Sequence, residues 1–150
     1  MNFLKKIFIK KKDYEVKKLT VTINSLDFST DSDSIQKMKE KYEKDNYIIS
    51  LQANLNMEGI EFEKRGELEK AINNYEENIK QNFEGNHPYD RLAIIYRKRK
   101  DYENEIRILK HAVHVFENIV NVKRGDRIPK LNKFKERLIK AEQLKNKNSL

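Results

Sequence analysis

Two histidines three residues apart, His111 and His114, come closest in this chain to the spacing of a metal site. On a helix, side chains at i and i+3 lie on one side, so both imidazoles could face one ion. A zinc site needs a third and a fourth ligand, and no matching histidine or carboxylate pair accompanies them. The chain has no cysteine, which excludes thiolate zinc sites and disulfides. We therefore predict no metal site and interpret both histidines as surface residues.

Residue patterns that would indicate catalysis are missing from the sequence. It contains no glycine-rich phosphate loop, no nucleophile elbow and no HExxH motif. His87 precedes Pro88, and we expect it to cap or pack at a turn rather than to catalyse. Most carboxylates stand beside lysines in helical patterns, where pairing at i and i+4 accounts for them. The sequence predicts no catalytic residue, no cofactor and no enzymatic activity.

The basic residues are unevenly distributed, and this bears on the class of partner. The chain has a net charge of +8, yet residues 13–90 hold 17 acidic and ten basic groups. A basic surface at 97–100 and 123–140 could contact phosphates in a nucleic-acid-associated regulator. Stacking aromatics are not interleaved there, and no known nucleic-acid module accompanies it. The alternatives are a solvated face or a surface complementary to the acidic front of a neighbouring molecule.

The N-terminal 30 residues are predicted to form a basic tail and an extended linker. Residues 1–12 place apolar side chains on one helical face among five lysines, as in a membrane-surface adaptor, a solubilising tail or a docked helix. Residues 14–28 are β-like and could be a linker or an arm that pairs with another chain. The chain has no secretory signal and no apolar run of the roughly 20 residues that span a membrane, so we expect a cytoplasmic protein.

The elements that would position any site come from one pattern written twice at a spacing of 34 residues, the period of a helix-turn-helix repeat. The matching pairs are Gly59 and Ala93, Phe62 and Tyr96, Leu68 and Tyr102, Ile72 and Ile106, and Tyr75 and Leu109. The pattern predicts helices over residues 47–64, 67–81, 88–99 and 102–121. Gly66 suits the left-handed residue that ends a helix, and Pro88 suits a first helical turn. These four helices form two predicted repeats, at about 52–85 and 86–121.

Further helices are predicted on both sides of the two repeats. Short polar residues at 29–34 favour a helix start, followed by Ile35, Met38 and Tyr42 on one inward face. Asp45 and Asn46 predict a break before the next helix. After a loop at 122–128, Pro129 is expected to open a last helix to about residue 146, with residues 145–150 frayed. Its predicted buried face is Leu131, Phe134, Leu138 and Ala141.

These residues resemble the tetratricopeptide repeat family. Gly59, Phe62, Ala71 and Tyr75 supply most of the family pattern in the first repeat, with Asn78 at the second small position. The second repeat is degenerate, because Glu105 replaces an alanine and Leu109 an aromatic residue, while Ala93, Tyr96 and Ala112 match. Part of the second repeat is similar to a variant common in small bacterial repeat proteins. The resemblance implies an all-α helical domain over 31–146, closed by a capping helix at about 129–146.

The resemblance also implies a non-enzymatic adaptor or scaffold that binds a peptide or a partner helix in a groove lined by the first helix of each repeat. The predicted groove residues are Asn56, Ile60, Glu63 and Lys64 in the first repeat, and Asp90, Ile94, Arg97 and Lys98 in the second. Asn56 and Ile60 stand where some family members carry the Lys and Asn that grip a terminal carboxylate, so that clamp is not expected. Two repeats give a short groove, which predicts weak binding or a homodimer that extends it.

Overall fold

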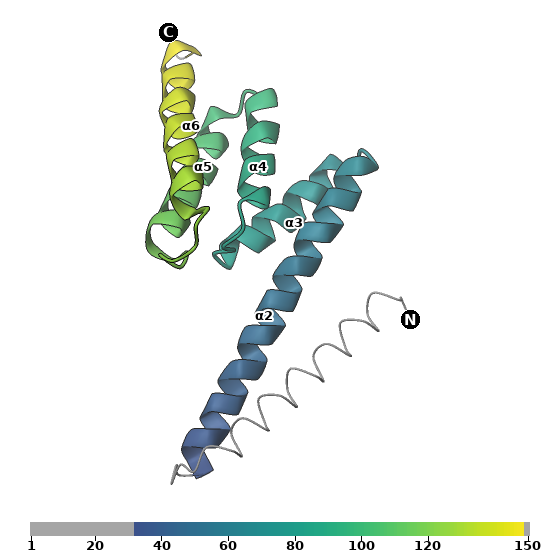
Figure 1. The fold of residues 1–150 in the computed structure, drawn as a ribbon. Coiled ribbons are helices and arrows are strands. Elements are labelled where there is room, and N and C mark those ends of the chain that lie inside the picture. The colour runs from purple at the N-terminus through teal and green to yellow at the C-terminus, as the bar shows by residue number, and fades with distance from the viewer. Residues whose placement is uncertain (1–31, 149–150) are drawn as a thin grey trace. The chain divides into compact units, whose positions relative to one another are not determined.

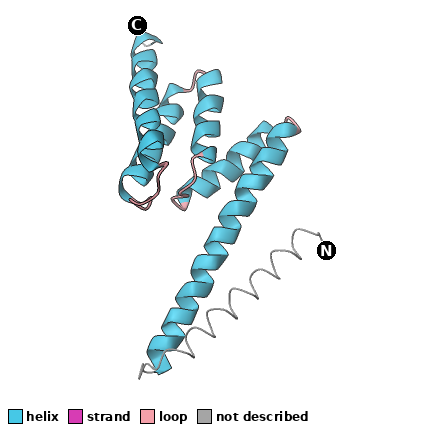
Figure 2. Ribbon diagram, in the orientation of Figure 1, coloured by secondary structure: helices cyan, strands magenta, loops and turns pink. Residues whose placement is uncertain are grey.

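The computed structural model describes residues 32–148, and these residues are entirely helical and contain no strand (Figures 1 and 2). Successive helices pack antiparallel on one another. The predicted tail and extended linker lie outside the described residues. The five helices within the described range are α2 (Ser32–Lys64), α3 (Leu68–Lys80), α4 (His87–Lys98), α5 (Tyr102–Asn118) and α6 (Arg127–Asn148). The chain divides into two compact units, residues 1–43 and 44–150, and everything below from Lys44 onward concerns the second.

The turn residues end and begin the helices as the sequence predicts. Gly66 has a φ of +78°, and the amides of Gly66 and Glu67 donate to the carbonyls of Glu63 (3.1 Å) and Phe62 (2.9 Å). These bonds satisfy carbonyls that the end of α2 leaves without a helical partner. Pro88 lies in the first turn of α4, where its missing N–H costs nothing. The predicted boundaries between α2, α3 and α4 are confirmed to within two residues.

The start of the helical region differs from the prediction. The break expected at Asp45 and Asn46 is wrong, because α2 runs through both residues without interruption. An aspartate or asparagine inside a helix costs only about 0.7 kcal/mol, which the remaining turns of a long helix readily offset. Met38, predicted to face inward, is wrong as well, since 63% of it is exposed.

The later helices also shift their ends. Helix α5 stops at Asn118, three residues early, where the amides of Ile119 and Val120 both donate to the Val115 carbonyl at 2.9 Å. This turn buries Val120, which is 3% exposed, and burial of its apolar surface favours leaving the helix. Helix α6 begins two residues before Pro129 and continues to Asn148, so the predicted fraying at 145–148 is wrong.

One continuous core joins α3, α4, α5 and α6. Four large aromatic side chains at its centre, Tyr75, Tyr89, Phe116 and Phe134, are at most 1% exposed. The Phe134 ring centroid lies 5.3 Å from Phe116 and 6.2 Å from Tyr89, so this α6 residue contacts both preceding helices. The predicted inner faces of α3 and α6 are confirmed, with Leu68 and Leu138 partly buried at their edges. This shared core fixes how α4, α5 and α6 present their outer side chains.

Candidate functional site

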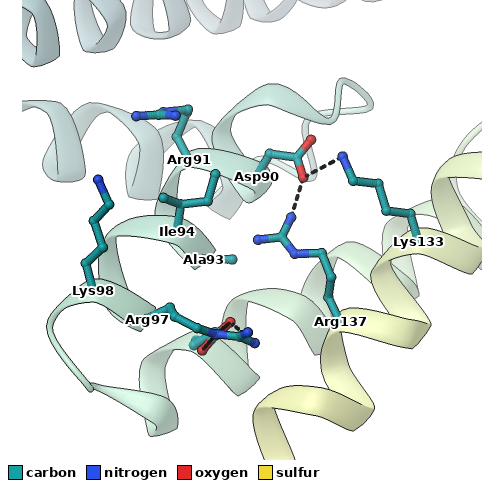
Figure 3. A pocket seen from close by; sticks show the side chains of 9 residues that line it. Asp90, Arg91, Ala93, Ile94, Arg97, Lys98, Lys133 and Arg137 are labelled. Atoms are coloured by element: carbon teal, nitrogen blue, oxygen red, sulfur yellow. Dashed lines mark hydrogen bonds and ion pairs between the residues drawn. The ribbon is translucent and has the colours of Figure 1, made fainter.

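The four groove residues predicted in the second repeat line a single cavity of about 620 Å³, which we call the α4–α6 depression (Figure 3). Arg91 and Ala93 of α4 complete one side, Glu105 of α5 lies below, and α6 contributes from the other side. The full lining is Asp90, Arg91, Ala93, Ile94, Arg97, Lys98, Glu105, Lys133 and Arg137. The tertiary structure thus places three helices around the residues that the repeat pattern selected on one.

A buried ion pair forms the floor of the depression. Glu105 is 0% exposed, and Arg97 Nε donates to both of its carboxylate oxygens at 2.8 Å. Arg97 Nη2 also lies 2.6 Å from Glu105 Oε1. A buried carboxylate is tolerated only when it is paired and hydrogen-bonded, so Arg97 provides the charge that Glu105 requires. Arg97 therefore has a structural task in addition to facing the depression.

A second, more exposed carboxylate connects α4 to α6 at the rim. Asp90 accepts a hydrogen bond from Arg137 Nη1, and Lys133 Nζ lies 3.6 Å away, as Figure 3 shows. Asn86 Nδ2 donates to the other carboxylate oxygen at 2.7 Å. Lys133 and Arg137 are one helical turn apart on α6, so both reach the same oxygen. The Asp90 side chain is 16% exposed, which leaves it in contact with solvent.

Positive charge exceeds negative charge around the depression. Its lining holds five cationic side chains and two carboxylates. One cation, Arg91, pairs with Glu63, which is not part of the lining. Lys98 has no ion-pair or hydrogen-bond partner among residues 32–148. The depression therefore offers an apolar surface at Ala93 and Ile94 surrounded by net positive charge.

The groove residues predicted in the first repeat do not line this cavity, and two of them serve internal contacts. Asn56 Oδ1 lies 3.0 Å from His87 Nδ1, which connects α2 to α4. Glu63 accepts from Tyr75 Oη at 3.1 Å and from Arg91 Nε at 3.0 Å. The Arg91 hydrogen bond holds the pKa of the Glu63 carboxyl below its usual value. Ile60 is partly buried, and Lys64 is exposed beside Glu61.

Sequence reasoning missed five lining residues: Arg91, Ala93, Glu105, Lys133 and Arg137. A signal existed for three of them. Glu105 stands where the pattern expects a small buried residue, which indicates that a charge partner must lie nearby. Lys133 and Arg137 have the i, i+4 spacing of side chains that project together from one helix face.

The histidine pair does not gather metal ligands. His111 Nε2 lies 2.9 Å from Asn82 Oδ1, and its ring lies 5.8 Å from that of Tyr89. Partial burial lowers the pKa of His111. His114 instead contacts Asn118 on its own helix. Within the described residues, no group of three or more histidine, aspartate or glutamate side chains is arranged to hold a metal ion.

Most of the predicted basic surface is engaged in ion pairs. Arg124 and Lys130 both pair with Asp126, and their hydrogen bonds hold the pKa of that carboxyl well below its usual range. Lys135 pairs with Glu117 at 2.8 Å. In the described part of this surface, the cations without such a partner are Lys98, Lys100, Lys123 and Lys140. These four do not form one lining, since only Lys98 belongs to the depression.

No protein-family profile, curated protein or solved structure matches this chain. Across residues 32–148, none of the helices has the length and apolar character needed to cross a membrane.

Proposed function

We propose that this chain is a cytoplasmic, non-enzymatic protein-interaction module of the tetratricopeptide type, which binds a peptide or a helix of its partner in the α4–α6 depression. The observation that carries the proposal is the lining itself. Asp90, Ile94, Arg97 and Lys98 were selected by the repeat register, and all four open onto one cavity.

The depression has the composition of a binding surface for a polypeptide. Ile94 and Ala93 provide apolar area at its centre, and long charged side chains surround them. Recognition sites for peptides combine an apolar contact with a polar rim that fixes orientation. A volume of about 620 Å³ holds a few side chains rather than a folded domain.

Site-specific photo-crosslinking tests the proposal. A photoreactive residue replaces Ile94 in one sample and Ile128 in another, and both proteins are irradiated in a lysate of the source organism after nuclease treatment. Ile128 is the matched control because it is 52% exposed and lies outside the lining. We expect a discrete protein adduct from position 94 and none from position 128.

The partner identified by the adduct is then tested with purified Ile94→Glu protein, in which a charge replaces the apolar centre. We expect at least about a tenfold loss of affinity, as for a central apolar contact. Equal adducts at both positions, or full affinity in Ile94→Glu, would overturn the proposal. An adduct that nuclease removes would instead favour nucleic acid as the ligand.

A further inference from the structure

The two carboxylates of the α4–α6 depression are held in different ways. Glu105 is completely buried and takes two short hydrogen bonds from Arg97. Asp90 lies at the rim, and its partner Lys133 is 60% exposed with an N···O separation of 3.6 Å. Exposed ion pairs contribute little to stability because water and salt screen them. Asp90 can therefore leave its cations at small cost, whereas Glu105 cannot.

The cations that Asp90 neutralises are those that an incoming ligand would meet first. Arg137 is 22% exposed and Lys133 is 60% exposed, and both extend from α6 toward α4 (Figure 3). On the opposite side of Ile94, Lys98 has no partner among the described residues. A ligand with two or more carboxylates could pair with Lys98 and with the α6 cations while its methylene groups contact Ile94.

We propose that the α4–α6 depression binds an acidic segment of a partner polypeptide, and that Asp90 is a resident anion with which this segment competes for Arg137 and Lys133. The inference rests on the proposed function and specifies the chemistry of the partner. In the free protein, Asp90 holds α4 and α6 in register. In the complex, partner carboxylates take over its role.

Charge complementarity favours an acidic polypeptide over a nucleic acid. A phosphate backbone is recognised by a continuous track of free cations. Beyond the depression, most described basic residues of α6 and its preceding loop already pair with Asp126, Glu117 or Asp90. The depression itself is short and has an apolar centre, which suits spaced carboxylates on a peptide.

The test measures fluorescence anisotropy of a dye-labelled peptide rich in glutamate and leucine, titrated with the full chain. A second peptide in which glutamine replaces every glutamate is the ligand control. We expect the acidic peptide to bind at least about tenfold more tightly than its amide counterpart, with a difference that shrinks as salt rises. Equal binding of the two peptides would overturn the acidic specificity, while crosslinking at position 94 would still report separately on whether the groove binds a partner.

Three variants test the competition. Asp90→Asn removes the resident anion and keeps a hydrogen-bonding side chain, and we expect it to raise affinity for the acidic peptide about three- to tenfold. Lys98→Gln should lower affinity about five- to tenfold. Lys123→Gln is the control for net charge, because Lys123 is exposed and outside the lining, and it should change affinity less than twofold.

A purely structural Asp90 would give the opposite result, since Asp90→Asn would weaken binding or leave it unchanged, and either result overturns the competition. Thermal unfolding of each variant verifies that it is folded at the assay temperature. Lys98→Gln remains informative in any case, because Lys98 is exposed and makes no contact on which folding depends. A single-stranded oligonucleotide of equal charge that bound with the same dependence on Lys98 would overturn the assignment to a polypeptide.

Discussion

Helices α2 and α3 meet through a glycine and an aromatic ring, whereas α4 and α5 carry larger and smaller residues at the corresponding positions. A Cβ added to Gly59 would lie 2.5 Å from Tyr75 Cε1, so the ring occupies the space that a side chain would need. Thirty-four residues later, Ala93 and Leu109 replace this pair, and both are completely buried. The volume lost at the aromatic position is thus partly recovered at the small one, as close packing requires.

The same two pairs also differ in charge. Ala71 in α3 and Glu105 in α5 are both 0% exposed and are separated by the same 34 residues. Glu105 is compatible with the core only because Arg97 is directed at it from α4. The polar contacts of the first pair instead connect Glu63 and Asn56 to Arg91 and His87. One repeat therefore uses its predicted groove residues to hold the next helix, and the other leaves them open around a cavity.

The largest expected effect concerns the buried ion pair. Arg97→Ala leaves Glu105 charged and without its partner, and we expect a loss of about 3–5 kcal/mol in the free energy of unfolding. The double variant Arg97→Ala/Glu105→Ala restores the alanine of the first repeat and should recover most of that loss. Urea denaturation measures both. A double variant as unstable as the single one would show that Arg97 acts through packing rather than charge.

A smaller effect is expected at the close contact of α2 and α3. Gly59→Ala should cost about 1–3 kcal/mol because its methyl group enters the Tyr75 ring, despite the better helix propensity of alanine. A double-mutant cycle with Tyr75→Leu, which reproduces the Ala93 and Leu109 pair, should show that the two costs are less than additive. Strict additivity would mean that the two positions do not compensate each other.

The Glu63 contacts predict an effect of about 1 kcal/mol at neutral pH for Glu63→Gln, since both groups of the ion pair are partly exposed. The folded-state pKa of Glu63 is depressed, so its contribution is present above the usual pKa of 4.5 and is lost as pH falls through the folded value. The difference between wild type and Glu63→Gln in denaturant unfolding should therefore narrow below about pH 4. A constant difference would contradict a role for the Glu63 charge.

The smallest expected effect concerns His87. Burial lowers its pKa below the usual 6.5, so the unfolded chain binds more protons than the folded one in the window below 6.5. Stability should consequently fall as pH drops through that window, by less than about 1 kcal/mol for this group. His87→Gln should reduce the slope, and His87→Gln/His111→Gln should reduce it further, because the pKa of His111 is lowered as well. An unchanged slope in the double variant would assign the effect to other groups.

Local patterns in the sequence predicted most of the helices and their inner faces. The apolar spacing gave Ala71, Ile72, Tyr75 and Ile79 as the buried face of α3, and all four are at most 6% exposed. Gly66 and Pro88 marked helix ends because each acts through its own backbone. The break at Asp45 and Asn46 was predicted wrongly for a related reason. Weak local preferences do not interrupt a helix that continues on both sides.

The candidate site was only half accessible to the same reasoning. The repeat register alone selected Asp90, Ile94, Arg97 and Lys98, because positions on one face of one helix follow from a period of 3.6 residues. Whether a position opens onto a cavity depends on which charged side chain from another helix reaches it. Glu63 meets Arg91 within the core region, whereas Asp90 meets Lys133 and Arg137 more than forty residues away in sequence. Helical periodicity determined the faces, and only the packing of α6 on α5 decided where the charges meet.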